Sequence, residues 1–264
     1  MSTATSNTGL TVIEANRFMA LDPNNEAMVA LKQNLAASGE EMGPSDLVRV
    51  KTPSAGGTRW EVPNALGAPE LTESLTGILV FYKTAGVLWP TESSKDGSLP
   101  VLKTFDLQVA EQVGPIPDDM IDVLERFRID ERHFNWKDLP YNQFGTGKNG
   151  HGKRCKEQRL MFLLRENDPF PLQLSAQPGS LKTVTGFIKK LAGKSPYYRA
   201  IVDLRLEKKI SKSGEAYSQI VPHLVGILSP EDGARVKREY TDVLERMVSR
   251  IDITPDGDDG GIDD

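Results

Sequence analysis

The segment from residue 200 to residue 221 places the strongest constraint on the fold. Apolar and charged residues alternate from position 202 to position 207, so one side of an extended chain would be buried and the other exposed. Ser-Lys-Ser-Gly at 211–214 supplies a turn, and a second extended run follows at 215–221. This pattern predicts an antiparallel β-hairpin, which needs further strands to cover its apolar side.

More extended segments precede the hairpin. They combine β-branched and aromatic residues with Pro and Gly at their ends, at 46–53, 55–63, 75–83, 87–90 and 158–164. Trp60 and Trp89 lie within these strand patterns, so we expect both in the core. The chain is therefore predicted to be β-rich.

Helices are expected around this sheet, at residues 22–39, 117–128, 180–193 and from 229 onward. Asp22 before Pro23 is typical of an N-cap, and Ser180 and Ser229 stand at the same position of their helices. Gly39 is suited to end the first helix. These helices indicate an α+β fold.

The chain separates its charges along the sequence. Residues 145–212 contain 15 Lys and Arg against 5 Asp and Glu, a charge of +10, whereas the whole chain carries −5, so the remainder carries −15. Such a basic segment in an acidic chain suggests a surface for a polyanion. Nucleic acid is the polyanion that we expect.

Composition narrows the class of protein further. A chain of 264 residues with 38% hydrophobic residues can bury a sizeable core. The single cysteine excludes an internal disulfide, and the sequence has no signal-peptide pattern and no apolar run of about 20 residues. We expect a cytoplasmic protein without a membrane partner; homo-oligomerisation stays open.

A groove for single-stranded nucleic acid needs cations along the backbone and aromatic faces on which bases stack. The basic segment and the residues leading into it offer both. The candidate residues are Trp136, Tyr141, Phe144, Lys148, Lys153, Arg154, Lys156, Arg159, Lys189, Lys190, Lys194, Tyr197, Tyr198, Arg199, Lys208, Lys209 and Lys212. The alternative is that the cations form an ordinary solvated face and that the aromatics are core residues.

The glycine-rich loop at 145–153 allows two other interpretations. Residues 147–153 match the G-x-x-x-x-G-K part of a phosphate-binding loop, but Arg154 stands where Ser or Thr must hold magnesium. His151 and Cys155 have workable spacing for two metal ligands, with His133 a distant third. Asp118 and Asp119 fit a helix first turn. We therefore expect no metal site, no cofactor and no catalytic activity.

Three stretches, at 46–63, 141–165 and 179–220, resemble a family of mostly uncharacterised proteins from phages, prophages and mobile elements. The resemblance implies nucleic-acid handling in replication or recombination, in the cytoplasm of a bacterial host cell. That family usually carries more cysteines near the counterpart of Leu139, consistent with a zinc-ribbon insert. This chain has only Cys155, so no metal site is carried over.

The acidic segment at the end of the sequence resembles the tails of bacterial and phage single-stranded-DNA-binding proteins. Those tails follow an oligonucleotide-binding (OB) barrel, recruit replication or recombination proteins, and commonly finish in an aromatic residue. This sequence finishes in Ile-Asp-Asp instead. Six aspartates without a basic residue at 252–264 predict a flexible segment.

These observations give one prediction for the whole chain. We expect an OB-like antiparallel barrel with added helices at both ends and a flexible acidic tail. The expected division is a disordered N-terminus with a helical arm at 1–45, the barrel domain at 46–250 and the tail at 251–264. The expected function is single-stranded-DNA binding; the alternative is an adaptor whose basic face binds an acidic protein.

Overall fold

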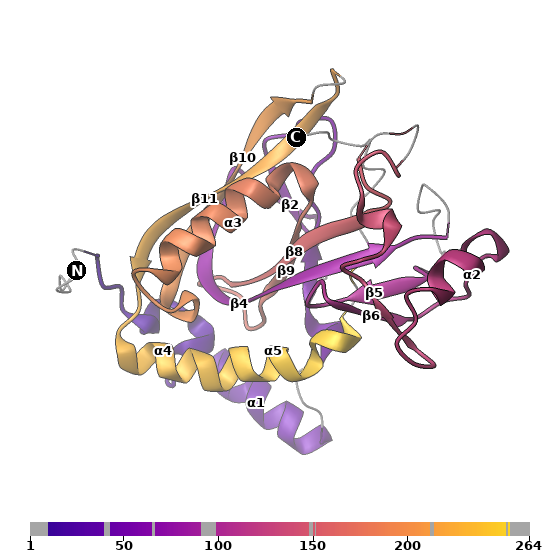
Figure 1. Ribbon diagram of the computed structural model, residues 1–264. Coiled ribbons are helices and arrows are strands. Elements are labelled where there is room, and N and C mark those ends of the chain that lie inside the picture. Colours follow the sequence, from indigo (N-terminus) through magenta and orange to yellow (C-terminus); the bar gives the residue numbers. More distant parts are fainter. Residues whose placement is uncertain are drawn as a thin grey trace.

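The strand β4 (Ser74–Leu88) is the centre of the fold, which we describe from a computed structural model (Figure 1). The structure describes residues 10–39, 43–64, 67–90, 99–147, 150, 152–211, 214–251 and 253. It is a mixed α+β fold with one large sheet and helices on both faces. No helix in these ranges is long and apolar enough to cross a membrane.

The sheet forks at β4. One edge of β4 pairs with β8 (Cys155–Leu164), and beyond β8 lie β9 (Leu172–Ala176) and the short parallel β1 (Val48–Val50). Its other edge pairs first with β10 (Ala200–Ile210), through residues 74–78, and then with β5 (Leu102–Thr104), through residues 86–88. The middle of this edge therefore lies between two separate branches.

The first branch is the hairpin predicted from the sequence. β10 pairs with β11 (Ala216–Ile227) along its whole length, with one register shift. The helix α3 (Pro178–Ala192) covers the outer edge of β11: Ile220 donates its backbone N–H to Ser180 Oγ at 2.9 Å, and the Gln219 amide donates to Gly179 O at 2.8 Å. Pro222, two residues beyond Ile220, has no N–H to leave unpaired on that edge.

The predicted OB-like barrel is not confirmed. Among the strands that the structure describes, β11 pairs only with β10, apart from an isolated parallel bridge between its last residue, Ile227, and Val12, and β9 pairs only with β8 and β1. The N-terminus of α3 reaches β11 where a closing strand pair would be needed. The sheet therefore stays open, and a helix covers its free edge.

One hydrophobic core lies between the sheet and α3. Val184, Ile188 and Leu191 of the helix pack against strand residues such as Leu79 and Met161. A small two-stranded sheet, β2 (Trp60–Val62) with β3 (Glu70–Thr72), completes this core. The Trp60 indole donates to Leu204 O at 2.9 Å, so the expectation that this tryptophan is buried is confirmed.

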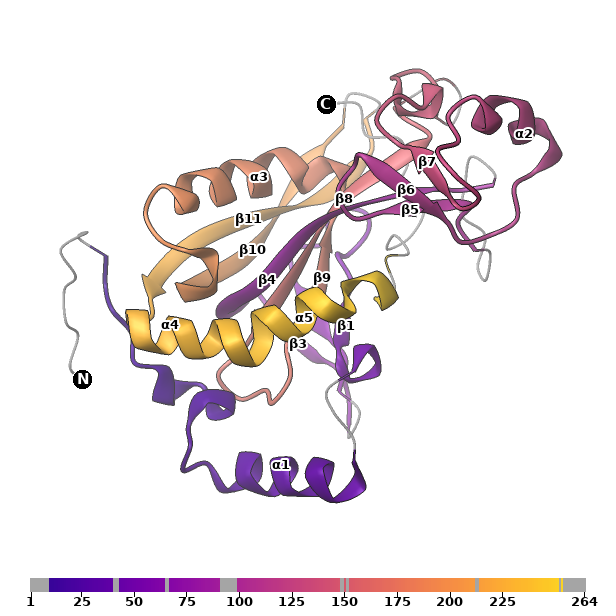
Figure 2. The same cartoon turned by 60° about the horizontal axis from the view of Figure 1, so that its bottom comes forward.

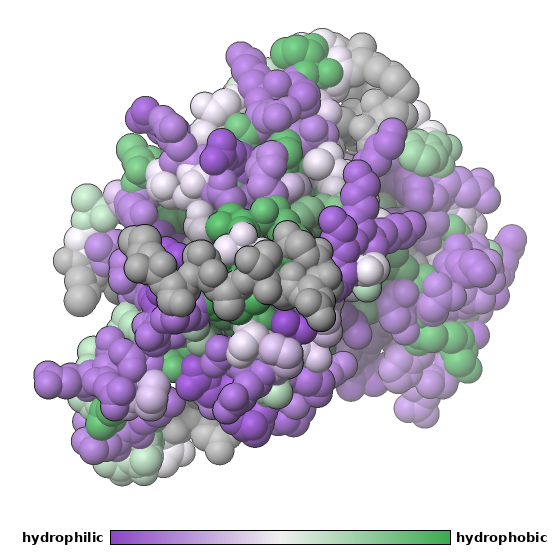
Figure 3. Space-filling model, turned by 90° about the vertical axis from the view of Figure 1, so that its left-hand side faces the viewer, coloured by the Kyte–Doolittle hydropathy of each residue, from purple (hydrophilic) through white to green (hydrophobic). Residues whose placement is uncertain are grey.

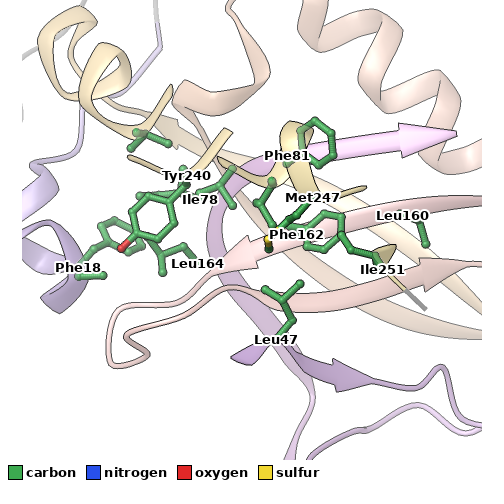
Figure 4. Close-up of a cluster of buried hydrophobic side chains, with 14 of the residues drawn as sticks. Phe18, Leu47, Ile78, Phe81, Leu160, Phe162, Leu164, Tyr240, Met247 and Ile251 are labelled. Carbon is green, nitrogen blue, oxygen red and sulfur yellow. The ribbon is translucent and has the colours of Figure 1, made fainter. Parts of the chain in front are cut away.

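A second core lies on the opposite face of the sheet (Figure 4). It is covered by α4 (Pro230–Val236), a π-helical turn (Lys237–Thr241) and α5 (Asp242–Met247). Tyr240 and Met247 pack in the same cluster as Phe81 and Phe162 of the strands. The Thr241 hydroxyl donates to Val80 O of β4, which fixes the π-helical turn against the sheet.

The second branch of the sheet belongs to a lobe formed by residues 99–147. Here β5 is followed by β6 (Val109–Gln112) and β7 (His133–Asn135), and α2 (Asp118–Glu125) packs beside them. Figure 2 shows this lobe at one end of the molecule, away from α3. The remaining short 3-10 turns are Ala15–Arg17, Met19–Leu21, Pro44–Asp46, Pro140–Asn142, Tyr197–Arg199 and Val248–Arg250.

The helix ends agree with the sequence in part. The first helix, α1 (Glu26–Ser38), ends at Gly39 with a φ of 70°, as expected, but its N-cap is Asn25, whose side chain accepts from Met28 N. Ser229 caps α4 through the backbone N–H of Asp232, as predicted. Ser180 is not a cap, because its hydroxyl is used by β11.

The domain boundaries drawn from the sequence need adjustment. Phe18 and Leu21, assigned to the N-terminal arm, are buried in the second core. Ile251 and Ile253, assigned to the tail, are buried there too, and Ile253 O accepts a hydrogen bond from the Gln158 amide. The rest of the predicted tail and residues 1–9 lie outside the described residues.

Replacing Ser180 with Ala tests whether the contact between α3 and β11 stabilises the fold. The substitution removes the acceptor of a buried N–H, so we expect the free energy of unfolding to fall by about 1–3 kcal/mol. Urea denaturation would measure it, with the exposed Ser249→Ala variant as the control. Equal losses in the two variants would contradict the assigned role.

Candidate nucleic-acid interface

The α3 side of the sheet carries polar residues where β4 and β8 extend past α3. The strand register places Thr84 opposite Arg159, and Gly86 opposite Glu157, on the same face as Tyr82. Trp136 of the lobe packs over Gly86: a Cβ added there would lie 2.6 Å from its ring. These side chains therefore lie between the lobe and the first core.

Contacts link these residues into a continuous row. Lys153 forms an ion pair with Glu157 at 3.1 Å, and Arg159 has electrostatic interactions with both Glu157 and Tyr82. The row continues from Tyr82 to Tyr197 and Lys194, which line one cavity with it. We call this row the α3-side track; it consists of Lys153, Glu157, Arg159, Tyr82, Tyr197 and Lys194.

The cavity has a volume of about 380 Å³ and lies at the C-terminal end of α3. Tyr82 and Tyr197 meet edge to face in its wall, with ring centroids 4.8 Å apart and an interplanar angle of 79°. Burial, followed by the nearby Tyr82, raises the pKa of Tyr197 to about 12. Its hydroxyl is thus neutral and can donate a hydrogen bond at any physiological pH.

Arg159 is the most unusual cation of the track. It is half-buried, and burial lowers the pKa of its guanidinium, with Tyr82 and Glu157 opposing that effect. Among the described residues its guanidinium has no hydrogen bond and no ion pair. A charged group that is partly removed from water without a close partner is available to a phosphate.

Three lysines lie at the C-terminal end of α3, and one of them, Lys194, lines the cavity. Lys189, Lys190 and Lys194 are exposed, and the first two occupy the last turn of the helix, where cations are stabilised by the helix dipole. Tyr198 contacts Tyr197 edge to face at 5.5 Å. The structure therefore brings two of the predicted site residues, Lys194 and Tyr197, together in the wall of one cavity, and Lys189, Lys190 and Tyr198 are their neighbours in the sequence.

The glycine-rich loop divides into accessible and structural residues. Phe144 is 70% exposed, and Lys153 lies over its ring at 5.5 Å. Arg154 instead donates to Pro90 O at 2.8 Å and lies over Tyr141 at 5.1 Å, so it attaches the loop to the lobe. Trp136 was wrongly predicted as an interface residue, because it is only 1% exposed.

The remaining predicted residues do not lie on the track. Arg199 donates twice to Leu228 O and packs beside Gly233, so its role is structural. Lys156 lies opposite Val87, on the face of the C-terminal helices. The stem of Lys208 packs on Gly56, and Lys209 pairs with Glu207 at 2.8 Å. Lys148 and Lys212 lie outside the described residues.

No metal site is found in the described ranges, where no three His, Cys, Asp or Glu side chains gather suitably. Cys155 is 1% exposed and packs in the core of the lobe, and burial raises the pKa of its thiol strongly. The strand β8, not a helix, follows the glycine-rich loop. The phosphate-binding-loop interpretation required a helix there.

Sequence reasoning missed Tyr82. Its segment was recognised as a strand, but the position of α3 beside it could not be inferred from local pattern. Comparison with known proteins adds nothing to this site: no family model, no curated protein and no solved structure matches the chain. The site therefore rests on its own geometry.

Replacing Arg159 with Met tests whether the half-buried guanidinium is unfavourable for folding. Since the charge is desolvated without a close partner, we expect the Tm to rise by about 1–3 °C. Arg126→Met, at an exposed position of the lobe, should leave the Tm unchanged. A lower Tm for Arg159→Met would mean that packing of the arginine stem outweighs the desolvation of its charge.

Proposed function

We propose that the protein binds single-stranded DNA without catalysis, in phage or prophage replication or recombination. The observation that carries this proposal is the α3-side track, where three cations, one of them paired with Glu157, and two aromatic rings lie along one surface. Single strands are bound by such combinations, because the cations follow the phosphates and each stacked base contributes about 1–3 kcal/mol.

The strand order supports an open OB-type domain. β4, β8 and β9 form an antiparallel meander with the lobe inserted between β4 and β8, α3 comes next, and β10 and β11 return to the other edge of β4. OB domains are partly open five-stranded barrels with Greek-key connections, so this order fits them. By this comparison, β4, β8, β9, β10 and β11 correspond to the first to fifth strands of an OB domain. The glycine-rich loop then precedes the second strand, β8, and the hairpin turn joins the fourth and fifth, β10 and β11.

The location of the proposed site differs from the common OB arrangement. OB domains usually bind oligonucleotides on the face of their second and third strands. Here one face of β8 is covered, because Leu160, Phe162 and Leu164 pack in the second core beneath the C-terminal helices (Figure 4). The α3-side track is therefore the stronger candidate for this chain.

The surface around α3 agrees with a polar ligand. Figure 3 shows hydrophilic residues over most of one side of the molecule, with apolar residues gathered near its centre. Protein-binding faces are depleted in lysine, whereas Lys189, Lys190 and Lys194 are exposed at the end of α3. The adaptor hypothesis has no comparable observation in its favour.

The triple variant Lys189→Ala, Lys190→Ala and Lys194→Ala tests the proposal. If the three lysines contact phosphates, affinity for a fluorescent oligo-dT should fall, and the slope of log K against log salt should flatten by about 2. Fluorescence anisotropy at several salt concentrations would measure both quantities. The parent protein should bind single strands much more tightly than duplex of the same length.

The matched control removes three exposed cations elsewhere: Lys32→Ala, Arg126→Ala and Lys137→Ala. It changes net charge equally but does not touch the end of α3. Equal flattening in both triple variants would show that only net charge matters. Tight binding restricted to duplex would contradict the proposed function itself.

The acidic segment after Ile253 is expected to compete with the strand for the same lysines. It contains five aspartates and no basic residue. A protein ending at Ile253 keeps both buried isoleucines and should bind oligo-dT several-fold more tightly at low salt, where screening is weak.

A full-length variant with these five aspartates changed to asparagine separates charge from length. It should behave like the truncated protein, and both should converge with the parent at high salt, where the screening length is only about 3 Å. Equal affinities of all three proteins at low salt would leave the segment without a competitive role. If the segment does compete with the strand, replication or recombination proteins that bind the segment would relieve that competition.

A further inference from the structure

We infer that the cavity at the end of α3 takes one nucleobase, turned out of the bound strand; this rests on the proposed single-strand binding. A volume of about 380 Å³ is near the lower end of ligand pockets, which range over about 300–1,000 Å³. It suits one nucleotide, not a stretch of strand. The cavity is thus a single position along a longer path.

The walls of the cavity suit the faces of a base. Ile188 and Pro196 supply apolar surface, and Tyr82 and Tyr197 supply aromatic rings. The two rings meet edge to face at 79°, so they do not stack on each other. In an edge-to-face pair the ring that presents its edge keeps its own faces clear of its partner, and such a face is where an inserted base would stack.

The charges around the cavity select a nucleotide over an uncharged aromatic compound. Lys194 lies in the wall, and Arg159 lies beside Tyr82 on the same face of the sheet. Phosphates on either side of the inserted base would therefore meet a cation each. Two carboxylates, Glu245 and Asp242, act on Tyr197, and Asp242 is already paired with Lys237 at 2.8 Å.

This arrangement separates two contributions to binding. The lysines of α3 contact phosphates and determine the salt dependence, whereas the cavity binds a neutral base and should contribute equally at every salt concentration. Loss of the base contact therefore lowers affinity without changing the slope against salt. Loss of the lysines changes that slope.

Tyr82→Leu and Ala192→Trp test the cavity in opposite ways. The first removes an aromatic wall, and the second fills the cavity from the exposed end of α3. By anisotropy with fluorescent oligo-dT, both should weaken binding about 10-fold, within the effect of one lost stacked base, with the salt slope unchanged. Tyr217→Leu, on the hairpin, is the matched control and should bind like the parent.

Photocrosslinking identifies the contact directly. An oligo-dT carrying 5-iododeoxyuridine, irradiated in complex with the full-length protein and mapped by mass spectrometry, should crosslink to Tyr82 or Tyr197. Parental affinity in both cavity variants, or crosslinks only at other residues, would overturn the inference while leaving strand binding intact. No binding of oligo-dT by the parent protein would overturn the proposed function and this inference together.

Discussion

The pairing of β4 with two different strands along one edge determines most of the structure. One edge of β4 pairs with β8. The other edge pairs with β10 at the beginning of β4 and with β5 at the end of β4. The branch with β10 and β11 continues to α3 and the first core, and the branch with β5 begins the lobe. The middle of β4 lies between these two branches, and Tyr82 is located in this middle part. The candidate site is thus a consequence of the fork.

The basic segment serves two purposes that its sequence does not distinguish. Arg154 and Arg199 use their guanidinium groups to hold backbone carbonyls in place, and Arg165 pairs with Glu70 and Asp168. These arginines stabilise loops and strand ends. The lysines at the end of α3 and the half-buried Arg159 have no such role among the described residues. Structural cations here are mostly arginines, whose planar group can satisfy several acceptors at once.

Local patterns predicted the local structure well. Alternation identified the hairpin, and the residues Gly39 and Ser229 marked helix ends, because each acts through neighbours within a few positions. The mixed α+β class followed from the same patterns. Local patterns do not predict contacts between distant segments. Ser180 resembles a helix cap in sequence, but its hydroxyl accepts a hydrogen bond from a residue 40 positions away.

The same limit applies to the candidate site. Lys189, Lys190, Lys194 and Tyr197 were predicted, because they are close together in the sequence. Tyr82 was missed and Trp136 misassigned, since whether an aromatic residue lines a cavity or fills a core depends on what packs over it. Nothing in the residues around Trp136 indicates that it covers Gly86.

The helix that covers β11 also affects how copies of this chain meet one another. An unprotected edge strand is a template on which another chain can add its own strand, which leads to aggregation. In β11 the Ile220 amide is already bound by Ser180, and Pro222 cannot donate at the next outward position. An open sheet can therefore persist at high protein concentration without joining edge to edge at this point.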